Sequence, residues 1–187
     1  MQKLSFKNRI ASNYIITTAL LIFVVFFVIY SIVKLSVYNH LNTDISKEVK
    51  NHLNEIEIKN NAFNLMYMKE WEEREHNTVD VNPVFIQFLD KNGTIIEKSP
   101  NLKNEVLYFN KEVANNELFD TKILSNKIRQ IQVPIYDEAN IIGYVMIAMS
   151  LEGALMVLQN LSKILSIAYP LILILLFFIA RIIVFFC

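Results

Sequence analysis

Three residues near the middle of the chain have side chains that suit a soft metal ion. Met66, Met68 and His76 offer two thioethers and an imidazole, donors that bind ions such as Cu(I) or Ag(I). In a helix, residues two apart point in different directions, so Met66 and Met68 would not converge on one ion. We therefore favour the alternative, in which the methionines fill a gap in a core and His76 is solvated.

Other polar side chains could bind a ligand. Gln87, Arg129 and Tyr144 lie in stretches with strand character and could face a pocket, where the arginine would recognise a carboxylate or phosphate. The alternative, which we favour, is that they decorate the surface of a sheet. The acid-rich run at residues 70–75 is best interpreted as a solvated helix face, and otherwise as a sensor patch for divalent cations.

No pattern in the sequence predicts a catalytic centre. A Ser/His/Asp set and a paired-carboxylate site both lack support, and the three glycines do not form a nucleotide-binding loop. We expect no enzymatic activity from the chain as it stands, and no cofactor.

Two helices are predicted ahead of the strands. From Leu41 to Ile56, apolar residues recur every three or four positions with polar residues between them, which indicates an amphipathic helix. Its apolar stripe must be buried on its own domain, against the same helix of a second subunit, or on both. Residues 62–76 predict a second, shorter helix that ends before Pro83.

A small antiparallel sheet is predicted downstream. The turn signal Asp90-Lys91-Asn92-Gly93 joins two strands into a hairpin. One later segment alternates apolar and polar residues, and its Pro134 indicates a stretch without a partner strand. The last segment is apolar on both sides, as a central strand would be. The predicted strands span residues 84–89, 94–97, 119–124 (the weakest, an edge candidate), 127–136 and 141–149.

Two apolar segments predict membrane-spanning helices. Residues 10–33 form a run of 24 without a charge, and residues 164–180 form a run of 17 before Arg181. A bilayer core needs about 20 apolar residues as helix. A cleaved signal peptide is the rival interpretation of the first segment, but its apolar run would be about 7–15 residues. Pro170 lies in the first turns of the second segment, and Arg181 can reach the headgroups.

The charge distribution predicts the orientation and excludes one class of partner. The stretch from Asp44 to Glu152 holds all 18 acidic but only 12 basic residues, a net charge of −6, so nucleic-acid binding is not expected. The first 13 residues carry three basic and no acidic side chains, which places the N-terminus in the cytoplasm. Cys187 is the one cysteine, so an intramolecular disulfide is impossible.

Three stretches, in this order, resemble a known family. Residues 84–102 have the strand-turn-strand pattern hydrophobic-x-Asp-x-x-Gly-x-hydrophobic-x-x-Ser-Pro. Residues 128–161 combine a Pro-flanked strand, a turn, a Gly-Tyr-Val strand and a helix opened by Ser-Leu-Glu. Residues 169–182 are an apolar helix with proline near its start and arginine near its end. Together they resemble the N-terminal sensor region of a bacterial two-component sensor histidine kinase.

The resemblance implies a PAS-like external domain, a homodimer and signal transfer through the membrane. It also implies an unknown extracytoplasmic ligand, and a response regulator reached only through a kinase domain. His40, His52 and His76 all lie outside a cytoplasmic His-Glu context, so we expect no autophosphorylation. The sequence stops six residues after Arg181, from which we expect a truncated product or a fragment.

We therefore expect an α+β protein of the bacterial inner membrane, with long stalk helices and a PAS-like domain between two spans. Pro170 and Arg181 are the candidates for signal transmission. The alternatives are the sensor region of a chemoreceptor or cyclic-dinucleotide receptor, or a non-signalling membrane scaffold. The expected segments are a cytoplasmic tail (residues 1–13), a first span (14–35), an extracytoplasmic sensor domain (36–163) and a second span (164–185).

Overall fold

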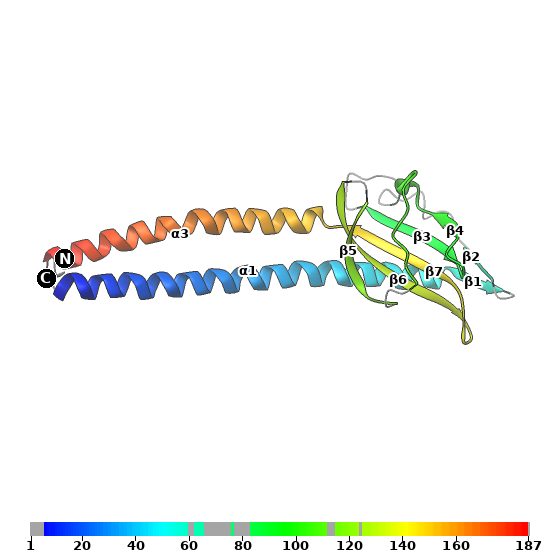
Figure 1. The fold of residues 1–187 in the computed structure, drawn as a ribbon, viewed down its shortest axis with the longest axis horizontal. Coiled ribbons are helices and arrows are strands. Elements are labelled where there is room, and N and C mark those ends of the chain that lie inside the picture. Colours follow the sequence, from blue (N-terminus) through cyan, green and yellow to red (C-terminus); the bar gives the residue numbers. More distant parts are fainter. Residues whose placement is uncertain are drawn as a thin grey trace. The chain divides into compact units, whose positions relative to one another are not determined.

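The computed structural model describes residues 6–59, 62–65, 76, 83–111, 115–123 and 125–186 (Figure 1). Two long apolar helices flank a small antiparallel sheet domain in the sequence, which confirms the predicted α+β class. The elements are α1 (Phe6–Asn54), β1 (Ile56–Lys59), β2 (Ala62–Leu65), β3 (Val84–Asp90), β4 (Ile95–Lys98), the 3-10 helix η2 (Pro100–Leu102), β5 (Leu118–Ile123), β6 (Asn126–Asp137), β7 (Asn140–Ser150) and α3 (Glu152–Phe186).

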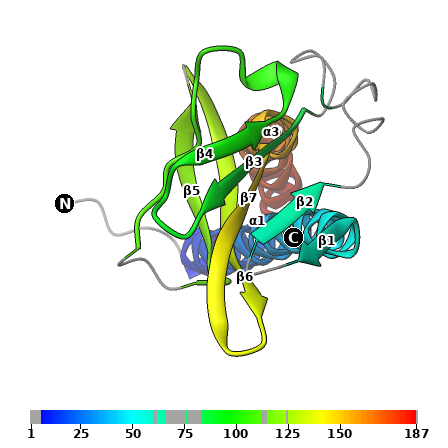
Figure 2. The same ribbon diagram turned by 90° about the vertical axis from the view of Figure 1, so that its right-hand side faces the viewer.

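Five strands form an antiparallel sheet in the order β4-β3-β7-β6-β5 (Figure 2). β7 lies in the middle, as predicted from its apolar residues on both faces. β5 is an edge strand of this sheet, also as predicted. The pairing of β5 with β6 ends at Leu118 and Ile131, so Pro134 pairs with Tyr144 of β7 but has no partner in β5. The prediction that Pro134 lies in a stretch without a partner strand therefore holds on one side of β6 only.

The last turns of α1 cover one face of this sheet. Ile45 has no exposed surface and belongs to a buried cluster with Ile86 and Val145 from the sheet. Leu41 and Val49, a turn away on either side, are partly buried against the same cluster. The apolar stripe of this helix is therefore buried on its own domain, the first of the two alternatives.

A β-hairpin replaces part of the second predicted helix. α1 ends at Asn54, and β1 pairs with β2, with Ile58 opposite Phe63. The prediction of helix over residues 62–76 is wrong for residues 62–65, because Phe63 is buried and Asn64 exposed, the alternation of a strand. His76 is helical, and the remainder of that prediction, with Met66 and Met68, lies outside the described residues.

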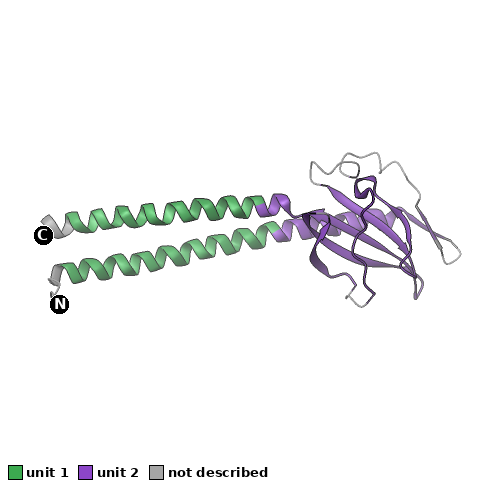
Figure 3. Ribbon diagram, turned by 45° about the horizontal axis from the view of Figure 1, so that its top comes forward, with its two compact units in different colours: residues 1–37, 156–187 green, residues 38–155 purple. Residues whose placement is uncertain are grey.

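Contacts between residues divide the chain into two compact units, coloured separately in Figure 3. Residues 38–155 contain the sheet and the last turns of α1. Residues 1–37 and 156–187 contain the apolar parts of α1 and α3. α1 contributes to both units as one uninterrupted helix.

The helical unit exposes large apolar side chains along both helices. Phe27 is 64% exposed and Leu175 60% exposed, and the most apolar stretches of the two helices have mean hydropathies of 2.7 and 2.4. Both helices are long and apolar enough to span a membrane. A core helix of a soluble protein would instead bury such residues.

Tyr169 of α3 contacts α1 within this unit. Its ring makes edge contacts with Phe23 and Phe26, and its hydroxyl donates a hydrogen bond to the carbonyl of Ala19 at 3.3 Å. The rings of Phe23, Phe26 and Tyr169 line a groove of about 350 Å³ together with Phe27, Tyr30, Ser162, Leu165 and Ser166. Pro170, the next residue, lies inside α3 and lacks the N–H that would continue the helical ladder.

Candidate functional site

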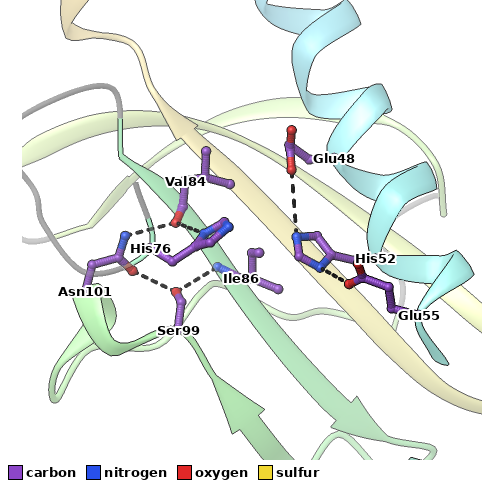
Figure 4. Close-up of polar contacts among 8 residues, drawn as sticks. All are labelled: Glu48, His52, Glu55, His76, Val84, Ile86, Ser99 and Asn101. Carbon is purple, nitrogen blue, oxygen red and sulfur yellow. Dashed lines mark hydrogen bonds and ion pairs between the residues drawn. The ribbon is translucent and has the colours of Figure 1, made fainter. Parts of the chain in front are cut away.

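Two buried histidines meet in the sheet domain (Figure 4). His52 lies in the last turn of α1 and is 4% exposed, while His76 is 1% exposed. Their ring centroids are 5.7 Å apart with the planes at 68°. Two carboxylates flank His52. Glu48 of α1 lies 3.8 Å from Nε2, and Glu55, the residue after the end of α1, lies 3.5 Å from Nδ1. Buried titratable groups so close together are typical of functional sites.

A polar network joins His76 to the sheet. Nδ1 of His76 lies 3.4 Å from the carbonyl oxygen of Val84, which also accepts a hydrogen bond from Asn101 Nδ2 at 2.9 Å. Asn101 Oδ1 accepts from the hydroxyl of Ser99 at 2.7 Å, and that hydroxyl oxygen accepts from the N–H of Ile86 at 3.0 Å. A carbonyl only accepts, so this contact requires the proton of a neutral His76 ring on Nδ1.

The predicted soft-metal site is only partly described. Met66 and Met68 lie outside the described residues, and the expectation that His76 is solvated is wrong, because its ring is buried. Among the described residues, no group of three or more His, Cys, Asp and Glu side chains is placed to hold a metal ion. The described contacts of His76 include the ring of His52 and the main-chain carbonyl of Val84.

Three buried glutamines lie on the sheet face opposite α1. They bind the main chain of residues 107–110, which we call the strap. Gln87 Oε1 accepts from the N–H of Leu107 at 2.9 Å, and Gln130 Nε2 donates to the carbonyl of Tyr108 at 2.6 Å. Gln132 accepts from the N–H and donates to the carbonyl of Asn110, both at 3.3 Å. The glutamines thus satisfy main-chain groups of the strap much as a partner strand would.

The strap also anchors apolar side chains in this face. Leu107 is 3% exposed and packs in the cluster that contains Tyr144 and Met146, and the ring of Phe109 lies 4.9 Å from that of Tyr144. Oε1 of Gln130 is buried and has no hydrogen-bond partner within the described part of the chain. A hydroxyl or amide donor of a bound molecule would satisfy this atom.

The structure separates the three predicted ligand residues. Gln87 and Tyr144 lie together on the face under the strap and are buried, so they do not decorate a solvated surface. Arg129 lies on the opposite face, because successive residues of a strand alternate. Its guanidinium binds the carboxylate of Asp120, donates to Asn42 Oδ1 at 2.6 Å and lies over the ring of Tyr38. Arg129 thus recognises a carboxylate of its own domain and ties α1 to the sheet.

The two residues predicted to transmit a signal lie in α3. Pro170 interrupts the hydrogen bonding of the helix, and Arg181 is exposed with its guanidinium 5.8 Å from the ring centre of Phe177. This packing covers the aromatic face with a cation. Their role in transmission stays a prediction.

Sequence reasoning missed His52, Gln130 and Gln132. His52 appears in the sequence as one polar residue among several in an amphipathic helix. The two glutamines stand at alternate positions of a predicted strand between Arg129 and Val133, and that spacing predicts only a shared face. Neither pattern reveals that the face is buried by the strap.

Comparison of the chain with protein-family models, curated proteins and solved structures finds no match.

Proposed function

We propose that this chain is the membrane signal-input module of a two-component sensor histidine kinase, with two spans, a PAS-like sensor domain and a homodimeric state. The observation that carries the proposal is helical continuity. α1 holds, without a break, both the apolar stretch of a span and the residues packed in the sheet domain's core. A change in that core can therefore reach the membrane through a rigid element.

The other end of the domain is connected just as directly. β7, the central strand, ends at Ser150, and α3 begins at Glu152. The residue between them, Leu151, is buried and its N–H donates to the carbonyl of Lys127 in β6 at 2.9 Å. Because one buried residue joins the two elements, a shift of β7 would be passed directly to the start of α3.

The sheet supports the PAS-like assignment. Counting from β3, the five strands stand in the order 2-1-5-4-3, with the first and last strands paired at the centre. That is the order expected of a PAS-like sheet. The strap and the buried glutamines cover the face on which such a domain would hold its ligand.

Thiol labelling tests the topology. Cys187 is the only cysteine, so Cys187→Ser gives a clean background for Lys91→Cys, at an exposed turn, and Lys3→Cys as its matched control. In intact cells, a membrane-impermeant maleimide should label Lys91→Cys but label Lys3→Cys only after permeabilisation. The reverse pattern, or equal labelling in intact cells, would overturn the topology.

A chimera tests the signalling role. Residues 1–182 should replace the input region of a histidine kinase whose output is measurable in cells. We expect kinase output to depend on the residue at which the helices are joined and to change when Ile45 in the sheet domain is substituted. Output that is identical at every junction and for every variant would favour the scaffold alternative.

A further inference from the structure

We propose that the groove between α1 and α3 in the helical unit binds a lipid-soluble quinone, a planar ring with carbonyl acceptors on an apolar tail. The inference goes beyond the proposed function, because it concerns binding by the helical unit alone, residues 1–37 and 156–187. It rests on that function only for the placement of both helices in a bilayer, from which such a molecule would enter the groove.

The groove lies where one face of each helix meets the other. α1 contributes the aromatic residues at positions 23, 26, 27 and 30, and α3 contributes Ser162, Leu165, Ser166 and Tyr169. Both sets follow the spacing i, i+3, i+4 and i+7, which keeps residues on one face of a helix. Serine side chains are short, so they leave room between the helices. The volume of about 350 Å³ is within the range of sites for small molecules, roughly 300–1,000 Å³.

Most of the lining is aromatic. Five of the eight lining residues are phenylalanine or tyrosine. Tyr169 contacts two of the rings edge-on, with centroid distances of 6.4 Å to Phe23 and 6.2 Å to Phe26. Phe23 is 57% exposed and Phe27 64% exposed, so both rings can be reached from outside the helix pair. Because aromatic pairs attract each other beyond the apolar area that they bury, this lining favours a planar ring over a flexible acyl chain.

Two serine hydroxyls give the groove its polar wall. In the apolar part of α1, Thr17 and Ser31 donate to carbonyls of their own helix, Ser31 to that of Phe27 at 2.8 Å. Among the residues that the structure describes, none bonds to the hydroxyl of Ser162 or Ser166, although both serines line the groove. Side chains four residues apart on a helix lie about 5–6 Å apart at Cβ. That separation is comparable with the distance between the two opposite carbonyl oxygens of a quinone, so one ring can accept from both serines.

Two other occupants fit the groove less well. An acyl chain of the bilayer would fill the volume but leave both hydroxyls without an acceptor, which costs free energy in apolar surroundings. A second copy of the chain would bring a helix whose main-chain carbonyls are already bonded within that helix. A quinone dissolves in the bilayer and supplies both the ring and the acceptors.

Photolabelling of the full chain in phosphatidylcholine nanodiscs tests the site. An azidoquinone with a decyl tail, at trace concentration, should label peptides from residues 23–30 or 162–169, as mapped by mass spectrometry. Decylubiquinone should compete for this labelling. Decylbenzene, which has the same tail and a ring but no carbonyl, should not. Labelling that cannot be competed, or that decylbenzene suppresses equally, would show a groove filled by any apolar chain and overturn the proposal.

Serine variants test the hydrogen bonds. Ser162→Ala and Ser166→Ala should each raise the decylubiquinone concentration that halves the labelling by about threefold to tenfold, because each removes one donor. Ser166→Phe fills the groove and should abolish the competed labelling. Ser31→Ala is the matched control, because its hydroxyl is bonded within α1 and Ser31 does not line the groove. Alanine variants of Ser162 and Ser166 that behave like this control would overturn the proposal.

A cysteine variant tests the second-copy alternative. In the Cys187→Ser background, Ser166→Cys should form few disulfide-linked dimers when decylubiquinone is in excess. Dimers that form in full despite the excess would assign the groove to a second copy and overturn the quinone site.

The topology and chimera experiments separate this inference from the proposed function. Thiol labelling with the expected topology, together with photolabelling that cannot be competed, overturns the quinone site and retains the membrane module. Competed photolabelling of a chain whose chimera is indifferent to sheet-domain variants retains the site and overturns the signalling role.

Discussion

At the scale of single residues, Gly143 of β7 leaves no room for a side chain. A Cβ there would lie 2.4 Å from Phe63 Cε1 and 2.5 Å from the carbonyl oxygen of Leu89, a main-chain atom that cannot step aside. We expect Gly143→Ala to lower the free energy of unfolding by about 2–4 kcal/mol in urea titrations. Gly153 is helical and has no atom within 4 Å of its would-be Cβ, so Gly153→Ala should leave the free energy of unfolding unchanged or raise it by up to about 1 kcal/mol. Equal losses would contradict the packing of β2 on β7.

Asp90 stabilises the β3–β4 turn through its charge. Its Oδ1 accepts from the N–H groups of Thr94 at 2.7 Å and Asn92 at 2.8 Å, and the bond from Thr94 is the main cause of a lowered Asp90 pKa. The native state therefore favours the carboxylate. The stabilisation is present above the unfolded pKa of about 3.9 and is lost as the pH falls through the lower folded pKa.

The Asp90→Ala variant should accordingly unfold at a lower temperature than the wild type near pH 7. The difference should shrink as the pH falls below the unfolded pKa of about 3.9 and through the lower folded pKa, where the wild-type carboxylate becomes protonated too. Asp90→Asn keeps an oxygen acceptor without the charge and should lie between the two at pH 7. A difference independent of pH would show that the charge of Asp90 contributes nothing.

The turn at Asp90 was predictable from sequence, while the histidine pair was not. Asp-x-Asn-Gly specifies a local conformation, because the side chain bonds to main-chain groups two and four residues on. His52 and His76 are 24 positions apart and meet only because α1 packs on the sheet. A sequence pattern predicts a local turn, but it does not predict a contact that depends on tertiary packing.

At the scale of elements, the end of α1 is a structural part of the sheet domain. Ile45 is fully buried in the cluster between α1 and the sheet, so Ile45→Ala should cost about 2–5 kcal/mol of unfolding free energy. Lys47 is exposed on the same helix, and Lys47→Ala should change stability by no more than about 0.5 kcal/mol. Guanidinium unfolding of the detergent-solubilised chain measures both. If Ile45→Ala unfolds like Lys47→Ala, the helix does not pack as described.

Arg129 forms a second connection between α1 and the sheet. Its guanidinium contacts Asp120 of β5 and Asn42 of α1, and its side chain is 16% exposed. We expect Arg129→Gln to cost about 1–2 kcal/mol, because it removes a charge-assisted pair and leaves polar partners partly buried. Lys127→Gln, an exposed cation of the same strand, is the control. If the two variants were equally stable, the contacts of Arg129 would contribute no more to stability than an exposed surface charge does.

The sequence predicted the long strands, whose apolar period is clear, and missed the short ones. β6 and β7 are long, and both were predicted within two residues of their ends. The four-residue strands β1 and β2 follow directly on an amphipathic helix, so their apolar residues extend its stripe in the sequence. Phe63 fits either period, and its pairing with Ile58 of β1 decides for the strand.

At the scale of the whole chain, two helices connect the sheet domain to apolar stretches. α1 enters the core from one face and α3 follows the central strand after one residue. A signal passed by rigid helices depends on their phase, about 100° per residue, and on their stiffness. These two properties can be altered separately by insertions at one place.

Lys163, in α3, is a suitable place for such insertions in the chimera with a histidine kinase. Four glycines there should uncouple kinase output from sheet-domain variants such as Ile45→Ala, because each glycine costs helix stability of about 1 kcal/mol relative to alanine. Seven alanines, about two full turns, should preserve both stiffness and phase and so retain the response. Kinase activity measured in membranes compares the three constructions at equal expression. If output still follows the Ile45 substitution through four glycines, the signal does not travel through a continuous α3, and α1 alone must carry it.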